Sequence, residues 1–357
     1  MTDREFQPDY RHVLDAAHNR RPARLPIYEH YIEAAVAEKV LGLSFAPLLQ
    51  AKRPADVDEF FRQYARFFKE MTYDTVSFEV CITRALPETG AIMGGRPGPI
   101  QSRRDFAAFP WDDIPRRYWE IATPQFDGLA RQMPPGMLAV GGAGNGVFEI
   151  AEDLVGYEYL CLMLADDPQL VGELFVRIGD VMVTIWQELL RRYGRWFALC
   201  RFGDDLGFKT STLLAPATIV QHVLPQHRRI VDCVHAAGGT FLLHCCGNIF
   251  DIMDAEIALG IDAKHSNEDA IAPFERWIEL YGQKIGLFGG IDVDLLVRES
   301  PDEISRRVIE RGSQFRRQAK GFALGSGNSI PDYVPVESYL AMIDGAKEIR
   351  RRELRQP

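Results

Sequence analysis

The sequence predicts an α/β protein built as a single (β/α)8 TIM barrel over residues 1–357. Eight short apolar runs, each ending in small or polar residues, recur along the chain, and helical stretches separate them. Strands that alternate with helices predict a parallel sheet, and eight such strands predict closure into a barrel. A doubly wound open sheet is the alternative. It requires a glycine-rich phosphate loop after the first strand, where Tyr28-Glu29-His30-Tyr31 stands instead.

The predicted strands occupy residues 25–30, 74–79, 138–143, 198–205, 241–246, 261–266, 285–290 and 322–327. Asp167-Pro168 begins an amphipathic helix that runs to Leu190, since apolar residues recur at helical spacing. A second helical region runs from Ala215 to Ala236, with an expected kink at Pro225. Pro301 and Pro335 begin two more helices. The pattern leaves a basic, helical N-terminal extension of about residues 1–24 and a long excursion over residues 84–136, expected to form a hairpin or lid.

Composition excludes several functional classes. The net charge of −9 argues against a nucleic-acid surface, because phosphate binding requires a basic footprint. No apolar run is long enough to span a bilayer, and the charged N-terminus lacks the apolar core of a signal peptide, so a cytoplasmic location is expected. The six cysteines are sparse for 357 residues, which favours reduced thiols.

Polar side chains gather at the predicted carboxyl ends of the strands. In TIM barrels these ends face the active site, whereas strand interiors fill the core. The candidate site residues are therefore Glu29, His30, Glu79, Asn145, Glu149, Asp204, Asp205, His244, Cys245, Cys246, His265, Asn267, Glu268, Asp292, Ser326 and Asn328. Helix capping is the structural alternative for the isolated carboxylates, such as Asp292 before Val293.

The stretch Leu243-His244-Cys245-Cys246-Gly247 indicates a metal site or a metal-free polar pocket. Side chains two apart on an extended strand point the same way, so His244 and Cys246 can reach one ion. Cys245 is then expected to face the opposite side. Imidazole and thiolate are ligands that zinc prefers, and a third protein ligand is expected.

Several segments together resemble the uroporphyrinogen decarboxylase superfamily. They are Gly203-Asp204-Asp205-Leu206-Gly207, Ala236-Ala237-Gly238-Gly239, His244-Cys245-Cys246-Gly247, Gly289-Gly290-Ile291-Asp292 and residues 325–331. The resemblance extends from about Pro26 to the last helix, and it implies one (β/α)8 barrel.

Within this superfamily, the resemblance favours the branch of corrinoid-dependent, methylcobalamin:coenzyme M-type methyltransferases. Authentic uroporphyrinogen decarboxylases carry a Met-Arg-Gln-Ala-Gly-Arg-Tyr segment and a Leu-Gly-His-Gly sequence. Here residues 26–31 replace the first, and Ser326 stands at the histidine of the second. Loss of those arginines removes the groups that hold substrate carboxylates.

The methyltransferase resemblance implies zinc bound by His244 and Cys246. Ser326 occupies the position of the family's third ligand, a cysteine. Either Cys245, Glu79 or Asp205 completes the ligand set, or zinc binds weakly, or the enzyme uses a different acceptor. The resemblance further implies a corrinoid, carried by a corrinoid protein, as a reaction partner. The decarboxylases of the superfamily are homodimers, so a homodimer is expected by resemblance to them.

Three functions follow in order of preference. The first is zinc-assisted methyl transfer between a corrinoid or small methylated compound and an acceptor. Asp204, Asp205 or Glu79 would serve as general base, and the remaining strand-end residues would line the substrate pocket. The second is a decarboxylase or other lyase in which Arg201 or Arg84 anchors a carboxylated substrate. The third is a barrel that only binds a tetrapyrrole or corrinoid.

Overall fold

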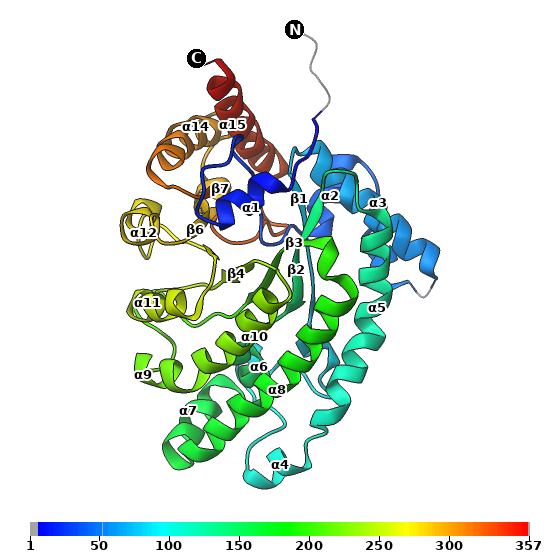
Figure 1. Cartoon of the computed structure of the whole chain (residues 1–357), viewed down its shortest axis with the longest axis vertical. Coiled ribbons are helices and arrows are strands. Elements are labelled where there is room, and N and C mark those ends of the chain that lie inside the picture. Colours follow the sequence, from blue (N-terminus) through cyan, green and yellow to red (C-terminus); the bar gives the residue numbers. More distant parts are fainter. Residues whose placement is uncertain (1–5, 52, 356–357) are drawn as a thin grey trace.

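Seven parallel strands form one curled sheet in the order β1 to β7 (Figure 1). The computed structural model describes residues 6–51 and 53–355. The strands are β1 (Thr75–Cys81), β2 (Leu138–Gly144), β3 (Phe197–Gly203), β4 (Phe241–His244), β5 (Ala263–His265), β6 (Gly286–Ile291) and β7 (Phe322–Ser326). Neighbours in the sheet are also consecutive in the chain, which confirms the predicted alternation of strands and helices.

The prediction of a regular first strand at residues 25–30 is wrong. This segment makes one isolated parallel bridge, between Ile27 and Leu324, to the edge strand β7. Pro26 has no N–H to donate, and the carbonyl of Glu29 accepts from the Ser77 hydroxyl of β1 rather than from a backbone N–H. Seven regular strands and one irregular segment therefore surround the interior of a TIM-like fold.

Helices follow the strands and pack around the sheet. The α-helices are α1 (Arg11–Ala17), α2 (Ala34–Leu41), α3 (Pro54–Glu70), α4 (Arg103–Ala108), α5 (Ile114–Gln132), α6 (Val147–Val155), α7 (Tyr157–Asp166), α8 (Pro168–Tyr193), α9 (Pro216–Thr218), α10 (Leu224–Ala236), α11 (Phe250–Leu259), α12 (Phe274–Tyr281), α13 (Val293–Arg298), α14 (Pro301–Gln318) and α15 (Val336–Arg355). Shorter helical turns are η1 (Ala46–Gln50), η2 (Ile82–Ala85), η3 (Ala91–Met93), η4 (Trp111–Asp113), η5 (Gly194–Trp196) and the π-helix η6 (Ile219–Val223).

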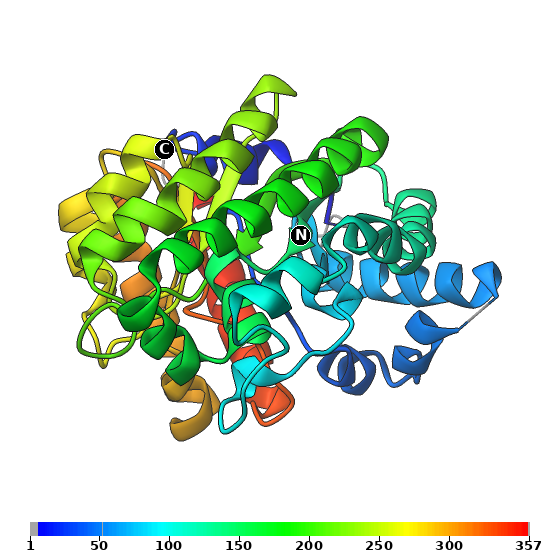
Figure 2. The same cartoon turned by 90° about the horizontal axis from the view of Figure 1, so that it is seen from below.

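The predicted helices after Asp167, Ser300 and Pro335 are confirmed as α8, α14 and α15. The region from 215 to 236 stays helical, and the π-turn η6 lies just before Pro225, where a kink was expected. The hairpin proposed for residues 84–136 is wrong, because this excursion folds into η3, α4, η4 and α5. Figure 2 shows α8 and α10 lying in front of the strands.

Near the amino ends of the strands, the interior of the barrel is filled by one apolar side chain from each of six strands. Val140, Leu199, Leu242, Ala263, Phe288 and Ala323 form this cluster, together with Tyr28 of the irregular segment and Val13, Ala16 and Ala17 of α1. Helix α1 thus closes the amino ends of the strands, with residues 1–5 of the proposed extension lying outside the described part. Any site must open at the opposite, carboxyl end.

Strand periodicity places a polar layer directly above this apolar cluster. Two residues after Leu199, Leu242 and Ala263 come Arg201, His244 and His265, whose side chains lie on the same strand faces. His30 follows Tyr28 at the same spacing, so the irregular segment still contributes to the layer.

Within the described residues, no helix is both long and apolar enough to cross a membrane.

Candidate functional site

His244, the last residue of β4, is the centre of the polar layer. Its Nε2 lies 3.3 Å from the Sγ of Cys246 and 4.0 Å from an Oδ1 of Asp205. Its Nδ1 lies 2.8 Å from the Nδ1 of His265, and its ring stacks on the ring of His30 with centroids 3.6 Å apart. Residues from β3, β4, β5 and the irregular segment therefore converge on one imidazole.

A chain of hydrogen bonds fixes which ring nitrogen of His244 carries the proton. The carbonyl of Ser326 can only accept, so the Nε2 of His265, 3.0 Å away, must donate to it. Burial lowers the pKa of His265 to about 3, which keeps that ring neutral and leaves its Nδ1 unprotonated. The Nδ1–H of His244 must therefore donate to His265. Because burial also holds the pKa of His244 well below its usual value, its Nε2 is unprotonated and faces the thiol of Cys246 at 3.3 Å.

The thiol of Cys246 lies where a cation would stabilise its ionised form. Burial and the nearby carboxylate of Asp205 raise the pKa of Cys246, so the thiol stays protonated unless a positive charge approaches it. Ser266 Oγ at 3.5 Å and Asn328 Nδ2 at 3.4 Å both donate to its sulfur. Ser266 has a φ of 99°, a left-handed conformation rare outside glycine, and such strain commonly occurs at functional sites.

Asp205, His244 and Cys246 offer three ligand atoms within 4.8 Å of one another. Ligand atoms bound at 2.0–2.3 Å in a tetrahedral zinc site lie roughly 3.3–3.8 Å apart, so small movements would bring this trio into place. Among the proposed third ligands, Asp205 fits the geometry. The buried thiol of Cys245 instead points away and accepts from the N–H of Leu206, as the strand alternation predicts.

His30, His244 and His265 form a second group with the same spacing. Both ring nitrogens of His265 are already used, one by His244 and one by the Ser326 carbonyl. A metal at this group would break that hydrogen-bond chain. The Asp205–His244–Cys246 trio lies outside the chain of hydrogen bonds through His265, and a metal there would leave that chain intact, so the donor chemistry favours it.

Glu79, the other proposed ligand, is held in an ion pair with Arg201. The Arg201 side chain is 1% exposed, and its Nη2 donates to Glu79 at 2.7 Å. Its Nη1 donates to the Tyr28 hydroxyl at 2.8 Å and to the His30 carbonyl at 2.7 Å. Arg201 therefore joins β1, β3 and the irregular segment beneath the mouth and positions the His30 backbone.

Ser326 does not face the metal trio. Its hydroxyl donates to the buried carboxyl group of Glu29, and its N–H donates to the same group at 2.8 Å. Burial raises the pKa of Glu29 to about 8. The position that the resemblance assigned to a third ligand thus serves a buried hydrogen-bond pair between the irregular segment and β7.

Asp204 lies in the wall of the barrel, between β3 and α6, rather than at the open carboxyl end of the strands. Its carboxylate accepts from the N–H groups of Phe148 and Glu149 and from His227 Nε2 at 2.7 Å. His227 in turn contacts Glu256 at 3.1 Å. The carboxylate therefore caps the start of α6, which agrees with the capping alternative for isolated carboxylates rather than with a role as general base.

Asn145 and Glu149 lie together beside the site. Asn145 Nδ2 donates to Glu149 at 2.8 Å, and burial, Asp205 and Asp204 raise the pKa of Glu149 well above its usual value. A Cβ added at Gly203 would lie within 3.9 Å of His244, Glu149 and His30. The absence of a side chain at Gly203 therefore leaves the space in which these three groups meet.

Asn267, Glu268 and Asn328 lie next to the trio, in the wall of a cavity of about 390 Å³. Asp292 lies there too and caps α13 through the N–H of Asp294 at 2.7 Å, as predicted. The sixteen candidates come from the ends of the strands, the loops that follow them, the irregular segment and the start of α6. They divide between the metal trio, its supports, this cavity and buried structural pairs.

Sequence reasoning missed Lys264, a buried cation on the outer face of β5. Burial lowers the pKa of Lys264 to about 8, and its ammonium lies 3.8 Å over the ring of Trp277 and donates to the Ser266 carbonyl. A lysine inside an apolar strand was the available signal. It also missed Tyr28 and Ser266, which interact with Arg201 and Cys246.

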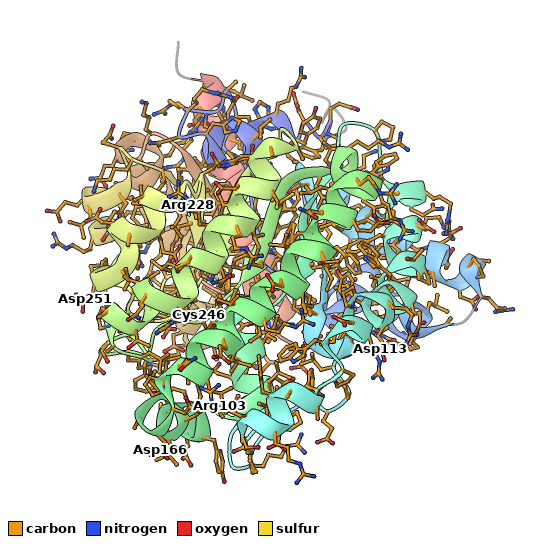
Figure 3. All side chains as sticks on the ribbon, turned by 60° about the horizontal axis from the view of Figure 1, so that its bottom comes forward. Arg103, Asp113, Asp166, Arg228, Cys246 and Asp251 are labelled. Atoms are coloured by element: carbon orange, nitrogen blue, oxygen red, sulfur yellow. The ribbon has the colours of Figure 1, made fainter. Side chains whose placement is uncertain are left out.

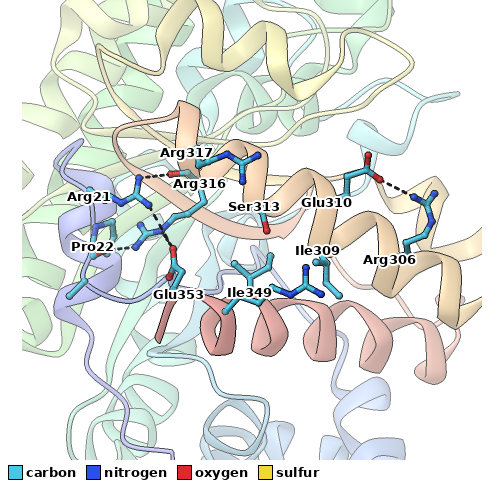
Figure 4. Close-up of a pocket in the computed structure, with 12 residues that line it drawn as sticks. Arg21, Pro22, Arg306, Ile309, Glu310, Ser313, Arg316, Arg317, Ile349 and Glu353 are labelled. Carbon is cyan, nitrogen blue, oxygen red and sulfur yellow. Dashed lines mark hydrogen bonds and ion pairs between the residues drawn. The ribbon is translucent and has the colours of Figure 1, made fainter. Parts of the chain in front are cut away.

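A second cavity, of about 950 Å³, lies elsewhere, between the N-terminal segment and helices α14 and α15 (Figure 4). Its wall is rich in arginine, but Glu353 pairs with Arg316 at 2.9 Å and with Arg21 at 3.8 Å. Arg306 pairs with Glu310 at 2.9 Å. This cavity contains neither histidine nor cysteine in its wall, so it is not the candidate metal site.

Replacing His265 by phenylalanine is expected to weaken zinc binding by roughly 10- to 100-fold, the range typical of groups that orient a ligand histidine. Phenylalanine keeps the packed ring but cannot accept the His244 Nδ1–H, so Nε2 is no longer the fixed ligand atom. Competition with a chromogenic chelator measures the affinity. The matched control is His222→Phe on η6, outside the site. Equal zinc affinities of His265→Phe and the unchanged protein would contradict the assignment.

Comparison with known proteins shows the fold and the family of the chain. A methyltransferase from Methanosarcina mazei has the same fold, with a TM-score of 0.75, 16% identity, and 96% of this chain and 99% of that chain covered. A putative vitamin-B12 independent methionine synthase from Listeria monocytogenes aligns with a TM-score of 0.51 and 11% identity over 91% of this chain and 98% of that chain. No curated protein matches the sequence. The sequence model of uroporphyrinogen decarboxylase (URO-D) matches residues 97–349, and the chain therefore belongs to the uroporphyrinogen decarboxylase family.

Proposed function

We propose that this protein is a methyltransferase that moves a methyl group between a corrinoid or small methylated compound and a thiol acceptor, assisted by zinc. The observation that supports this most is the unprotonated Nε2 of His244, which lies beside Cys246 Sγ and Asp205 Oδ1. An imidazole, a thiol and a carboxylate form a donor set suited to zinc. The Methanosarcina mazei methyltransferase shares the fold.

When bound, zinc supplies the positive charge that lowers the pKa of an acceptor thiol. The chain's own residues then position that thiol and take up its proton. We assign the proton transfer to Glu149, because it lies beside His244 and Asn145 Nδ2 donates to its carboxylate at 2.8 Å. Asp204 supports α6 in this proposal, and Arg201 holds Glu79 and the His30 backbone in place.

Decarboxylation has less support from the geometry. Arg201, the first anchor proposed for a carboxylated substrate, is engaged, because its guanidinium already donates to Glu79, Tyr28 and His30. The other proposed anchor, Arg84, lies on η2 with its Nη2 3.3 Å from the side chain of Gln50. Methyl transfer requires no such anchor.

In our proposal a corrinoid protein presents the methyl group at the carboxyl ends of the strands, and the chain acts as a homodimer.

Zinc analysis combined with a methyl-transfer assay tests the proposal. Purified protein should contain about one zinc per chain and should catalyse transfer from methylcobalamin to a small thiol. In this reaction the Co–C bond breaks, an S–C bond forms, the thiol proton passes to a base, and cob(I)alamin is released. The absorption of cob(I)alamin measures the rate. A metal-free protein that releases CO2 from a porphyrinogen and transfers no methyl group would overturn it.

A further inference from the structure

We propose that the cavity of about 950 Å³ between residues 21–23, α14 and α15 binds a small organic dianion with an apolar body, either a phosphate monoester or a dicarboxylate. The cavity lies near the amino ends of the strands, because α14 leads into β7 and residues 21–23 lead into the irregular segment. The metal trio lies at the opposite, carboxyl end. This site therefore goes beyond the proposed function and does not depend on it.

The wall of this cavity is positively charged in a chain that is negatively charged as a whole. It contains five arginines, two glutamates and no lysine or aspartate, which gives the wall a net charge of +3, whereas the whole chain carries −9. An arginine fork matches the oxygen atoms of carboxylates and phosphates, so the wall suits an anion. The arginines come from three segments and are Arg21, then Arg306, Arg316 and Arg317 of α14, and Arg352 of α15.

Two of the five arginines are already used in building the wall. Arg306 donates to Glu303 through Nε and Nη2 and to Glu310 through Nη1. The side chain of Arg316 is 4% exposed, and it donates to Glu353 at 2.9 Å and to the carbonyl of Pro22. Arg316 therefore ties α14 to α15 and to the N-terminal segment, and it contributes its charge rather than free N–H groups.

The other three arginines keep N–H groups without an acceptor. Arg317 is exposed and has no hydrogen-bond or ion-pair partner within residues 6–51 and 53–355. Among the same residues, Arg352 donates only through Nε, to Glu348 at 2.9 Å. Arg21 donates through Nη1 to the carbonyl of Arg316 at 2.9 Å, and its Nη2 stays 3.8 Å from Glu353. These unused donors are available to a ligand.

Figure 4 shows how the arginines are arranged along the cavity. Arg21, Arg316 and Arg317 lie together at one end, with Glu353 beside them, whereas Arg306 and Glu310 lie at the other end. The unpaired donors thus gather away from the pair that neutralises itself. We place the charged group of the ligand at the Arg21–Arg317 end.

The ends of the helices explain only part of this arrangement. Arg316 and Arg317 lie in the last turn of α14, and Arg352 lies in the last turn of α15, where cations offset the helix dipole. Arg21 belongs to no helix, yet its guanidinium is held against the carbonyl of Arg316. The fold therefore brings a further cation to a place where two helices already supply three.

The balance of charge at this end indicates a dianion. The wall there contains four arginines and one carboxylate, that of Glu353. Arg352 is offset by Glu348, which lies outside the wall. Two positive charges remain without a counter-ion, so a dianion would neutralise them and a monoanion would leave one.

The rest of the wall is apolar and favours an organic ligand. A bare inorganic anion would leave this apolar surface in contact with water, whereas a ring or short carbon chain would cover it. The volume of about 950 Å³ is within the range of small-molecule sites. The apolar wall residues are Pro22, Ala23, Ile309 and Ile349.

Isothermal titration calorimetry with four compounds at one salt concentration tests the ligand class. Phenyl phosphate and phthalate carry a ring and two negative charges, inorganic phosphate lacks the ring, and benzyl alcohol lacks the charge. We expect one of the two ring dianions to bind at least roughly tenfold more tightly than inorganic phosphate or benzyl alcohol, since each of these loses either the apolar or the charge-assisted contacts. The tighter of the two dianions shows whether the charged group is a phosphate or a pair of carboxylates.

Three variants test the assigned residues with that tighter dianion. Arg317→Gln and Arg21→Gln should each weaken binding roughly tenfold, because each removes one cation with unused donors. Glu353→Gln should tighten binding severalfold, because it removes the carboxylate of that end while its amide oxygen can still accept from Arg316. A gain in affinity cannot come from a loss of folding.

Arg228→Gln is the matched control. Arg228 lies on α10 at the surface of the molecule (Figure 3), 58% exposed and 3.8 Å from Asp232, and it is absent from the cavity wall. This variant changes the net charge of the protein by the same amount as Arg317→Gln and should bind the dianion as the unchanged protein does.

The outcomes distinguish this site from the proposed function. Removal of zinc with a chelator should leave the affinity for the dianion unchanged, so dianion binding without methyl transfer would support the site alone. Four results would overturn the site: no binding of either ring dianion, equal binding of inorganic phosphate or benzyl alcohol, unchanged affinity in Arg317→Gln and Arg21→Gln, or an equal loss in Arg228→Gln.

Discussion

Replacing Cys246 by alanine is expected to abolish stoichiometric zinc binding and to lower methyl transfer by on the order of a thousandfold. In the proposed site Cys246 would supply the sulfur ligand, 3.3 Å from His244 Nε2, and the remaining carboxylate and imidazole would hold the metal far less tightly. Elemental analysis after dialysis measures the zinc, and cob(I)alamin absorption measures the rate.

The neighbouring thiol provides the matched control. Cys245→Ala removes the same atoms one residue earlier, from a buried side chain that faces Leu206 and not the trio. It should keep its zinc and most of its rate, with a modest loss of stability from the small cavity. Full zinc content in Cys246→Ala, or zinc loss in Cys245→Ala alone, would show that the strand presents the other thiol to the metal.

Replacing Arg201 by methionine is expected to lower the free energy of unfolding by about 3–5 kcal/mol, the cost of leaving a buried partner charge unpaired. Its side chain is 1% exposed, and Glu79, Tyr28 and the His30 carbonyl all depend on its N–H groups. Urea unfolding followed by circular dichroism measures the change.

Two further variants test whether the loss comes from the unpaired charge. Arg201→Met combined with Glu79→Gln should recover part of the stability, because no unpaired carboxylate then remains. Arg276→Met, which breaks an exposed helical pair with Glu279, should change stability by no more than about 0.5 kcal/mol. Equal effects of Arg201→Met and Arg276→Met would show that the buried pair contributes little.

The regular parts of the fold followed from local pattern. Helix α8 begins at Pro168 after Asp167, whose side chain accepts from the N–H of Leu170, and such capping depends on residues a few positions apart. The irregular segment at 25–30 did not follow, because the apolar pattern is the same for a regular strand. Its pairing depends on Ser77 and Leu324, which lie far away in the chain.

The candidate site shows the same division. That His244 and Cys246 face one way and Cys245 the other follows from strand alternation, a property of the sequence alone. Which ring nitrogen of His244 carries its proton depends on His265 and the Ser326 carbonyl, which two other strands contribute. Resemblance to relatives pointed to Ser326 as the missing ligand position, and the tertiary structure turned its hydroxyl toward Glu29.

The sequence by itself therefore determined the order of strands and helices, the end of the sheet where polar groups gather, and two ligands of the candidate metal site. These depend on short periodicities and caps, which act between near neighbours. Only the tertiary structure decided that Asp205 joins the trio, that Asp204 and Glu79 are already engaged, and that Asn267 keeps an unused donor. Those outcomes depend on contacts between residues far apart in the sequence, and a local sequence pattern does not specify how far apart such residues lie in the folded chain.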